Sequence, residues 1–331
     1  MQVLPLALFL VMLELTVGSF LSLYLLDLRG DTSRGFVIFQ GALYLVFAVL
    51  TLLAFANFAS LGSPADYGLD PTWYRAQGPL LVATTLLMIP WNILLWADRQ
   101  PRDKAARKAA AQQPTSALRR ARFAVGALTT LAALVAIFAA GMAYRTLAAS
   151  RLDGAFVVLA FVAGAVALGG VMTAMLLGHW YLNTPTASGK PLEFVTALLV
   201  VALFAELVFS LFIGPTTARA HLPTSNVTPG TTIQTNPNGI TIITPTPNPT
   251  PGAAQDVTKQ EARQAPVGQD AMRWLEYLMG FLAPLALGGI ALYLTRGRSF
   301  QSATGMLYLC VAFIFIGEVI GRGLLLFPVL S

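Results

Sequence analysis

Long apolar runs separated by short polar segments dominate the chain. Eight of these runs have about 20 residues or more, the length that a helix needs to cross a hydrocarbon core of roughly 30 Å. They cover residues 3–26, 36–59, 78–97, 121–144, 154–179, 192–214, 274–295 and 303–328. The first run is too long for the apolar core of a signal peptide and contains Glu14, so we interpret it as a retained helix. The pattern predicts an all-α fold, a polytopic membrane helix bundle with eight transmembrane helices.

Composition agrees with this pattern and excludes several kinds of cofactor site. Of 331 residues, 56% are hydrophobic and 11% are charged, whereas about 25% are charged in an average soluble domain. The single cysteine, Cys310, excludes a disulfide framework, a thiolate zinc site, a covalently attached haem and an iron–sulfur cluster held by this chain alone. The two histidines are His179 and His221, and we expect no metal site.

Lysine and arginine positions predict the orientation of the helices. Eight basic residues fall between the third run and the start of the fourth, and this segment is expected to be cytoplasmic. By alternation, the cytoplasmic side receives 13 basic residues and the outer side 7, so both termini are predicted outside. We therefore expect a multi-pass protein of a bacterial-type inner (plasma) membrane. The positive-inside rule explains the high pI, so nucleic-acid binding is not implied.

The same reading divides the chain into three parts. Residues 1–215 hold transmembrane helices one to six, with a basic cytoplasmic loop at 98–120, and residues 271–331 hold helices seven and eight. Residues 216–270 form an extracytoplasmic loop rich in threonine and proline. Within it, "TTIQTNPNGITII" has two short β runs around a Pro-Asn-Gly turn, which predicts a small hairpin. This loop is interpreted as a spacer, with a docking loop as the alternative.

Four charged residues lie well inside the apolar runs, where each ionised group is costly and hence a functional candidate. They are Glu14, Glu206, Glu318 and Arg322. Their positions place the three carboxyl groups roughly 12–17 Å below the outer surface, at ~1.5 Å of rise per residue, and Arg322 at about 9 Å. All four can therefore share one layer. The alternatives are a quinone or proton site and a polar contact that only fixes helix packing.

The electrical balance of these four residues favours the functional reading. Glu318 and Arg322 are four residues apart and can form an ion pair on one helix face, beside the close-packing step of Gly317 and Gly321. Three carboxyl groups and one guanidinium cannot all be ionised cheaply in a membrane. At least one carboxyl group is therefore expected to bind a proton near neutral pH.

A second candidate is "GHWYLNTP", residues 178–185, at the predicted cytoplasmic end of the fifth run. Its aromatic residues are typical of the membrane interface, and Asn183 to Pro185 are expected to end the helix. His179 is either incidental to this anchor or a hydrogen-bond partner of a quinone head group or proton path. Gly170, Ala174 and Gly178 form a small-residue ridge that allows a neighbouring helix, or a flat ring, close to the backbone. Ligation of a haem by two histidines is disfavoured because His221 falls in the outer loop, whereas ligation by His179 with another axial group stays open.

The seventh run begins with a further charged pair. Arg273 and Glu276 are three residues apart and are expected to form a surface pair. Pro284 is expected to kink this helix, because proline removes an intrahelical hydrogen bond.

Two stretches, "LELTVGSFL" at 13–21 and "GEVIGRGLLLF" at 317–327, together with the eight-helix topology, resemble a known family. The family is the membrane anchor subunit of dimethyl sulfoxide reductase-type molybdoenzymes. The resemblance implies a haem-free, quinol-oxidising anchor that passes electrons to an iron–sulfur partner. It places Glu318 and Arg322 in the characteristic last helix and implies nothing for His179.

Three functions are open at this point. The first is a membrane subunit that anchors a redox complex, interacts with quinone or quinol and passes electrons to a partner subunit such as an iron–sulfur protein. The second is a proton- or ion-coupled carrier, and the third is a structural or assembly subunit without a site of its own. As an enzyme, the chain is at most a non-catalytic or quinol-oxidising subunit of an oxidoreductase complex.

Overall fold

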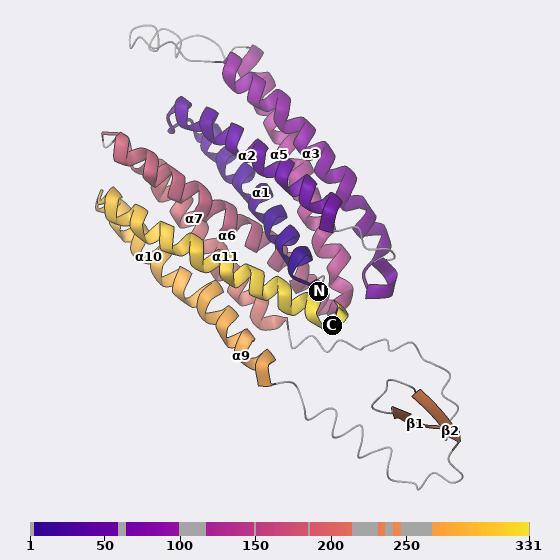
Figure 1. Cartoon of the computed structure of the whole chain (residues 1–331). Helices are drawn as coiled ribbons and strands as arrows, with labels where there is room; N and C mark the ends of the chain where they lie inside the picture. Colours follow the sequence, from indigo (N-terminus) through magenta and orange to yellow (C-terminus); the bar gives the residue numbers. More distant parts are fainter. Residues whose placement is uncertain are drawn as a thin grey trace. The chain divides into compact units, whose positions relative to one another are not determined.

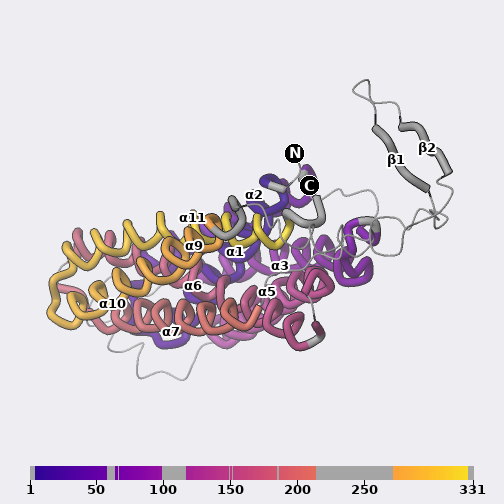
Figure 2. Tube along the Cα trace, turned by 90° about the horizontal axis from the view of Figure 1, so that it is seen from below, coloured from indigo at the N-terminus to yellow at the C-terminus, as the bar shows by residue number. Residues whose placement is uncertain are grey.

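A computed structural model describes residues 3–58, 64–98, 117–148, 150–184, 186–213, 231–235, 241–245 and 267–330. The chain divides into two compact units, one formed by Met1–Ala218 with Arg273–Ser331 and the other by Arg219–Met272. The first unit is a bundle of helices that run along one common direction (Figures 1 and 2). The basic segment 99–116, His221 and most of the 216–270 loop lie outside the described residues.

The described part of the chain contains eight helices long and apolar enough to span a membrane, which confirms the predicted polytopic all-α bundle. The first six are α1 (Val3–Arg29), α2 (Arg34–Phe58), α3 (Pro71–Ala97), α5 (Ala117–Tyr144), α6 (Arg151–Asn183) and α7 (Lys190–Phe212). The seventh is built from α9 (Val267–Glu276), the π-helical segment η3 (Tyr277–Leu282) and α10 (Ala283–Arg296), and the eighth is α11 (Phe300–Leu330). The short 3₁₀ turns η1 (Pro64–Tyr67) and η2 (Arg145–Leu147) precede α3 and α6.

Polar residues at the helix ends explain why several helices extend beyond the apolar runs. The Asp70 carboxylate accepts hydrogen bonds from the backbone N–H groups of Thr72 (3.0 Å) and Trp73 (3.4 Å), so α3 begins seven residues before its apolar run. The Ser150 hydroxyl accepts from the N–H of Asp153 at the start of α6. α6 ends at Asn183, where the sequence predicted an end.

α1 is the most deeply buried of the eight helices. It packs against α2, α5, α6 and α11. Gly18 of α1 and Gly169 of α6 allow the two backbones to touch, since a Cβ atom on either glycine would collide with the backbone of the other helix. A hydrogen bond of 2.8 Å between the hydroxyl groups of Tyr44 and Thr173 joins α2 to α6 beside this contact.

α1 begins and α11 ends at the same end of the bundle, called here the terminal end (Figure 1). At the other end, two aspartates and two arginines form a closed network that joins four helices. Arg34 contacts Asp27 (2.8 Å) and Asp98 (3.6 Å), and Arg122 contacts the same two carboxylates (3.2 and 2.5 Å). The assignment of the terminal end to the outer side stays a prediction.

The seventh helix departs from α-helical geometry just before Pro284, the position at which a kink was predicted. Residues Tyr277–Leu282 form a wider π turn. This turn makes room for the ring of Pro284, which would otherwise clash with the preceding turn, and it accommodates the missing N–H donor of that proline. Gly280 in this segment packs directly on Gly317 of α11, where a Cβ atom would collide with the facing backbone. The seventh and eighth helices are therefore in close contact at this level.

The described part of the second unit contains a two-stranded antiparallel sheet. Strands β1 (Thr231–Thr235) and β2 (Thr241–Pro245) lie on the two β runs of the sequence, and Ile233 pairs with Ile243.

Arg122→Ala is expected to destabilise the bundle strongly. The Arg122 side chain is 4% exposed, and its loss leaves two carboxylates with one guanidinium. Breaking a buried pair in this way costs about 3–5 kcal/mol of the free energy of unfolding. Denaturation of the purified protein in detergent would measure the loss. The control is Arg296→Ala, which removes an exposed ion pair with Glu193 and should cost less than about 1 kcal/mol. Equal losses in the two variants would contradict a structural role for the network.

Candidate functional site

Arg322 of α11 is the centre of a buried cluster of four charged residues. Its Nη2 atom lies 2.5 Å from Glu14 Oε1, 3.0 Å from Glu318 Oε2 and 3.5 Å from Glu206 Oε1. These carboxyl groups come from α1, α11 and α7. The prediction that the four residues share one layer is confirmed, and so is the ion pair between Glu318 and Arg322 within α11.

The cluster is almost completely withdrawn from the surface. The exposed fractions are 0% for Glu14, 2% for Glu206, 6% for Glu318 and 8% for Arg322. At this burial the charges interact strongly with one another, and any charge left without a partner is costly. The single positive charge of Arg322 can neutralise only one of the three carboxylates. The other two carboxyl groups must be balanced by bound protons or by further polar groups.

α6 supplies a fourth wall that the sequence analysis did not identify. The guanidinium carbon of Arg322 lies 4.2 Å above the ring of Phe161, at cation–π distance. Gly164, one turn further, leaves the space that the cluster fills. A Cβ atom there would lie 2.6 Å from Glu206 Oε1 and 2.8 Å from Arg322 Nη2. A glycine inside a long apolar run gives no sign of this role without the structure.

A partly open pocket adjoins the cluster toward the terminal end. It has about 70 Å³ of interior space, and about 560 Å³ when its mouth is included. Apolar side chains of α6, α7 and α11 form much of its wall, and Arg322 reaches it from the cluster. The lining residues are Val157, Ala160, Ser210, Ile213, Arg273, Glu276, Tyr277, Gly321, Arg322, Leu324 and Leu325.

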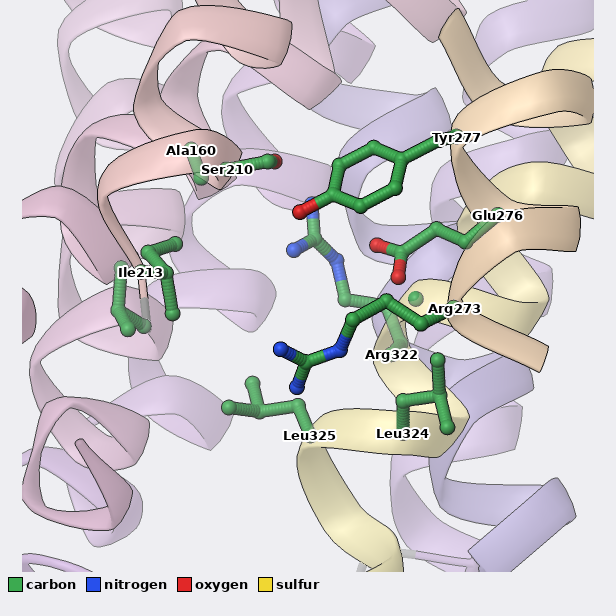
Figure 3. A pocket seen from close by; sticks show the side chains of 11 residues that line it. Ala160, Ser210, Ile213, Arg273, Glu276, Tyr277, Arg322, Leu324 and Leu325 are labelled. Atoms are coloured by element: carbon green, nitrogen blue, oxygen red, sulfur yellow. The ribbon is translucent and has the colours of Figure 1, made fainter. Parts of the chain in front are cut away.

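Three polar side chains of the seventh helix enter this pocket on one helix face. Arg273, Glu276 and Tyr277 are spaced i, i+3 and i+4, and Figure 3 shows them extending toward Ser210 and Ile213 on the other side. Arg273 and Glu276 were expected to be a surface pair. That interpretation is wrong, because both side chains are half-buried and line the pocket.

His179 lies apart from the other candidates. It is 15 residues beyond Gly164 on α6, which is about 22 Å along the helix, toward the end that carries the Asp27 network. It is exposed, and its Nδ1 atom lies 3.3 Å from the hydroxyl group of Tyr308. The structure therefore brings together four of the five candidates and leaves His179 out.

The small-residue ridge next to His179 is filled by protein. Gly170 packs against Leu199 of α7, and Gly178 packs against Thr304 of α11. Trp180 makes an edge contact with Phe36, and the Tyr181 hydroxyl donates to the Ser188 carbonyl (2.7 Å). Of the two occupants expected on this ridge, the structure shows neighbouring helices, and the motif anchors the end of α6.

The described residues contain no group of three or more His, Cys, Asp or Glu side chains that could hold a metal ion. The pocket itself presents carboxyl, guanidinium and phenol groups. These can bind and release protons and donate hydrogen bonds to the oxygen atoms of a ligand.

Gly164→Ala is expected to disrupt the Arg322 cluster, because the added methyl group would lie too close to Glu206 and Arg322. A lower melting temperature in detergent would measure this effect. Gly305→Ala is the matched control, since a Cβ atom at Gly305 of α11 meets nothing within 4 Å. If both variants melt like the unmodified protein, the cluster is not tightly packed around Gly164.

No protein-family model matches the chain, and no curated protein or solved structure matches it either.

Proposed function

We propose that this chain is an integral membrane subunit that binds quinol in the pocket beside Arg322 and passes its electrons to a partner subunit. The observation that supports the proposal most is the composition of the pocket wall. It combines apolar surface with two guanidinium groups, a carboxyl group and a phenol within one partly open space. Pockets of this kind suit a flat apolar ring with polar oxygen atoms at its edges.

The pocket residues would have two roles, apolar contact with the quinone ring and hydrogen bonding to its oxygen atoms. The side chains of Val157, Leu324 and Leu325 would contact the faces of the ring. The guanidinium of Arg322 and the hydroxyl of Tyr277 are the donors available to the quinone oxygens. Oxidation of a quinol releases two protons and two electrons, and carboxyl groups are the bases that can take up the protons.

The electrons require a second protein. The single cysteine of this chain cannot hold an iron–sulfur cluster, so the acceptor belongs to a partner, and an iron–sulfur protein is the class that fits. The likeness of "GEVIGRGLLLF" to the anchor family points in the same direction, since Glu318 and Arg322 lie in that stretch. With both termini outside a bacterial inner membrane, the pocket would open toward the outer side.

A proton- or ion-coupled carrier is the second candidate. The surplus of carboxyl groups around Arg322 favours it, because such groups can bind a cation or proton in the membrane. Flux in liposomes without any redox partner would support the carrier over the quinol-oxidising subunit. A purely structural subunit would show neither activity.

A photoreactive quinone analogue should label two segments of the purified protein in lipid nanodiscs. We expect adducts within 273–277 and 321–325, because both segments line the pocket. Peptide mass spectrometry after illumination would locate them, with and without an excess of unlabelled quinone. Labelling that excess quinone does not displace, or labelling confined to the His179 region, would contradict the proposal.

Glu318→Gln should lower quinol-linked electron transfer without a matching loss of protein. The substitution removes a negative charge 3.0 Å from Arg322. We expect the rate to fall about 10²-fold, the cost of displacing a binding group by roughly 1 Å, because Arg322 loses one of the carboxylates that hold it beside the pocket. Quinol-dependent reduction of an acceptor by isolated membranes would be compared with protein abundance by immunoblot.

Glu193→Gln is the matched control for this experiment, because Glu193 forms an exposed pair with Arg296 and does not line the pocket. It should leave the rate unchanged. If Glu318→Gln reduces rate and abundance equally, the carboxyl groups serve packing alone.

A further inference from the structure

We infer that Glu276, and none of the three carboxyl groups that contact Arg322, exchanges protons between the pocket and the water at the terminal end of the bundle. The inference rests on the proposed function and assigns one step of it to one residue. Glu276 was not among the candidates of the sequence analysis.

The first reason is that Glu276 is accessible to a ligand in the pocket. Among the described residues that line the pocket, Glu276 is the only one with a carboxyl group. Glu14, Glu206 and Glu318 contact Arg322 and do not line the pocket. A ligand in the pocket would therefore meet Arg322 and Glu276 and would not contact the other carboxyl groups.

Pairing is the second reason. Each of the three other carboxyl groups has an oxygen within 3.5 Å of Arg322 Nη2, so each helps to hold the guanidinium in place. Glu276 forms no such ion pair within the described residues, and the charged groups that face it are Arg322, Arg273 and Glu318. It can therefore change its charge without breaking a buried ion pair, a step that is costly for the other three carboxyl groups.

Position is the third reason. Glu276 is half-buried, whereas the other three are almost fully buried, so it lies between the cluster and the surface. Arg273, one turn nearer the start of α9, lines the same pocket, and α9 lies at the terminal end of the bundle (Figure 1). The order Arg322, Glu276, Arg273 thus leads from the buried layer outward.

Gly321 holds Glu276 in this position. A Cβ atom at Gly321 would lie 2.6 Å from Glu276 Oε1, so the carboxyl group occupies the space that the missing side chain leaves. The contact between Gly280 and Gly317 keeps the seventh helix close to α11 one turn away. Glu276 is therefore set against α11 at the residue next to Arg322.

The proton-transfer step balances in a simple way. An O–H bond of the quinol breaks and an O–H bond forms on a Glu276 carboxylate oxygen, while the electrons pass to the iron–sulfur partner of the proposed function. Glu276 then releases the proton to water at the terminal end. The second proton follows the same route after Glu276 is again ionised.

Carbodiimide labelling of the whole protein in nanodiscs tests this inference without an activity assay. Dicyclohexylcarbodiimide is apolar and modifies protonated carboxyl groups, so Glu276 should be the main site found by peptide mass spectrometry. Its labelling rate should fall about tenfold per pH unit once the group is mostly ionised. Modification of Glu14, Glu206 or Glu318 with no modification of Glu276 at any pH would overturn the inference.

Two glycine variants test the position of the carboxyl group. Gly321→Ala should slow the labelling of Glu276 several-fold, because the methyl group takes the space of the carboxyl group. Gly323→Ala should not, since a Cβ atom at Gly323 meets nothing within 4 Å. Equal rates in the two variants would also overturn the inference.

Protection by quinone separates the two proposals. If excess quinone slows the labelling of Glu276, both stand. If Glu276 is labelled with the expected pH dependence but quinone gives no protection, the proton-exchanging role of Glu276 stands and the quinone site is wrong.

Discussion

The guanidinium of Arg322 is the charge on which the terminal half of this bundle depends. A cation buried in a membrane-spanning helix must be paired, and the partners of Arg322 come from three helices, with Phe161 of a fourth beneath it. The helices can approach closely enough only because glycines stand at the contacts. Gly164 makes room for the charged side chains, and the pairing of Gly18 with Gly169 brings α1 against α6.

The two ionic clusters of the bundle differ in their balance of acidic and basic groups. This difference distinguishes a cluster that ties helices together from one that can take part in proton binding. The network of Asp27, Arg34, Asp98 and Arg122 has equal numbers of acids and bases, and each guanidinium contacts both carboxylates. Such a network closes on itself and needs no further partner. The Arg322 cluster has more acid than base, and a pocket adjoins it. Surplus charge beside a pocket is the arrangement in which protons can be taken up and released.

The sequence alone allowed the fold and much of the cluster to be predicted, for one physical reason. Ionisable residues are so unfavourable in lipid that a few exceptions in long apolar runs stand out, and counting residues from the helix ends places them at one depth. Glu14, Glu206, Glu318 and Arg322 were found in this way. Gly164 could not be found, because a glycine in an apolar run has many possible roles and only the neighbouring helices show which one applies.

One error of the sequence analysis has an equally physical cause. Arg273 and Glu276 stand at the start of a helix, where charged residues usually face water, and nothing in the sequence shows that α11 and α7 cover them. His179 was considered because it falls near a membrane face beside Trp180 and Tyr181, and its role in a quinone or proton site stays a prediction. The structure places it at the end of the bundle that the neutral network occupies.

The arrangement of charge limits any chemistry to one half of the bundle. The pocket, the surplus acid and the polar face of the seventh helix all lie toward the terminal end, while the opposite end is tied together by a network without surplus charge. A proton bound at Glu276 has a short path to the surface at the terminal end. Its path to the other end leads past the buried Arg322 cluster. A carrier would need the polar site to open to both ends in turn, whereas a site that takes protons from a bound ligand needs one opening. The pocket beside Arg322 is partly open and lies toward the terminal end, which fits the second requirement.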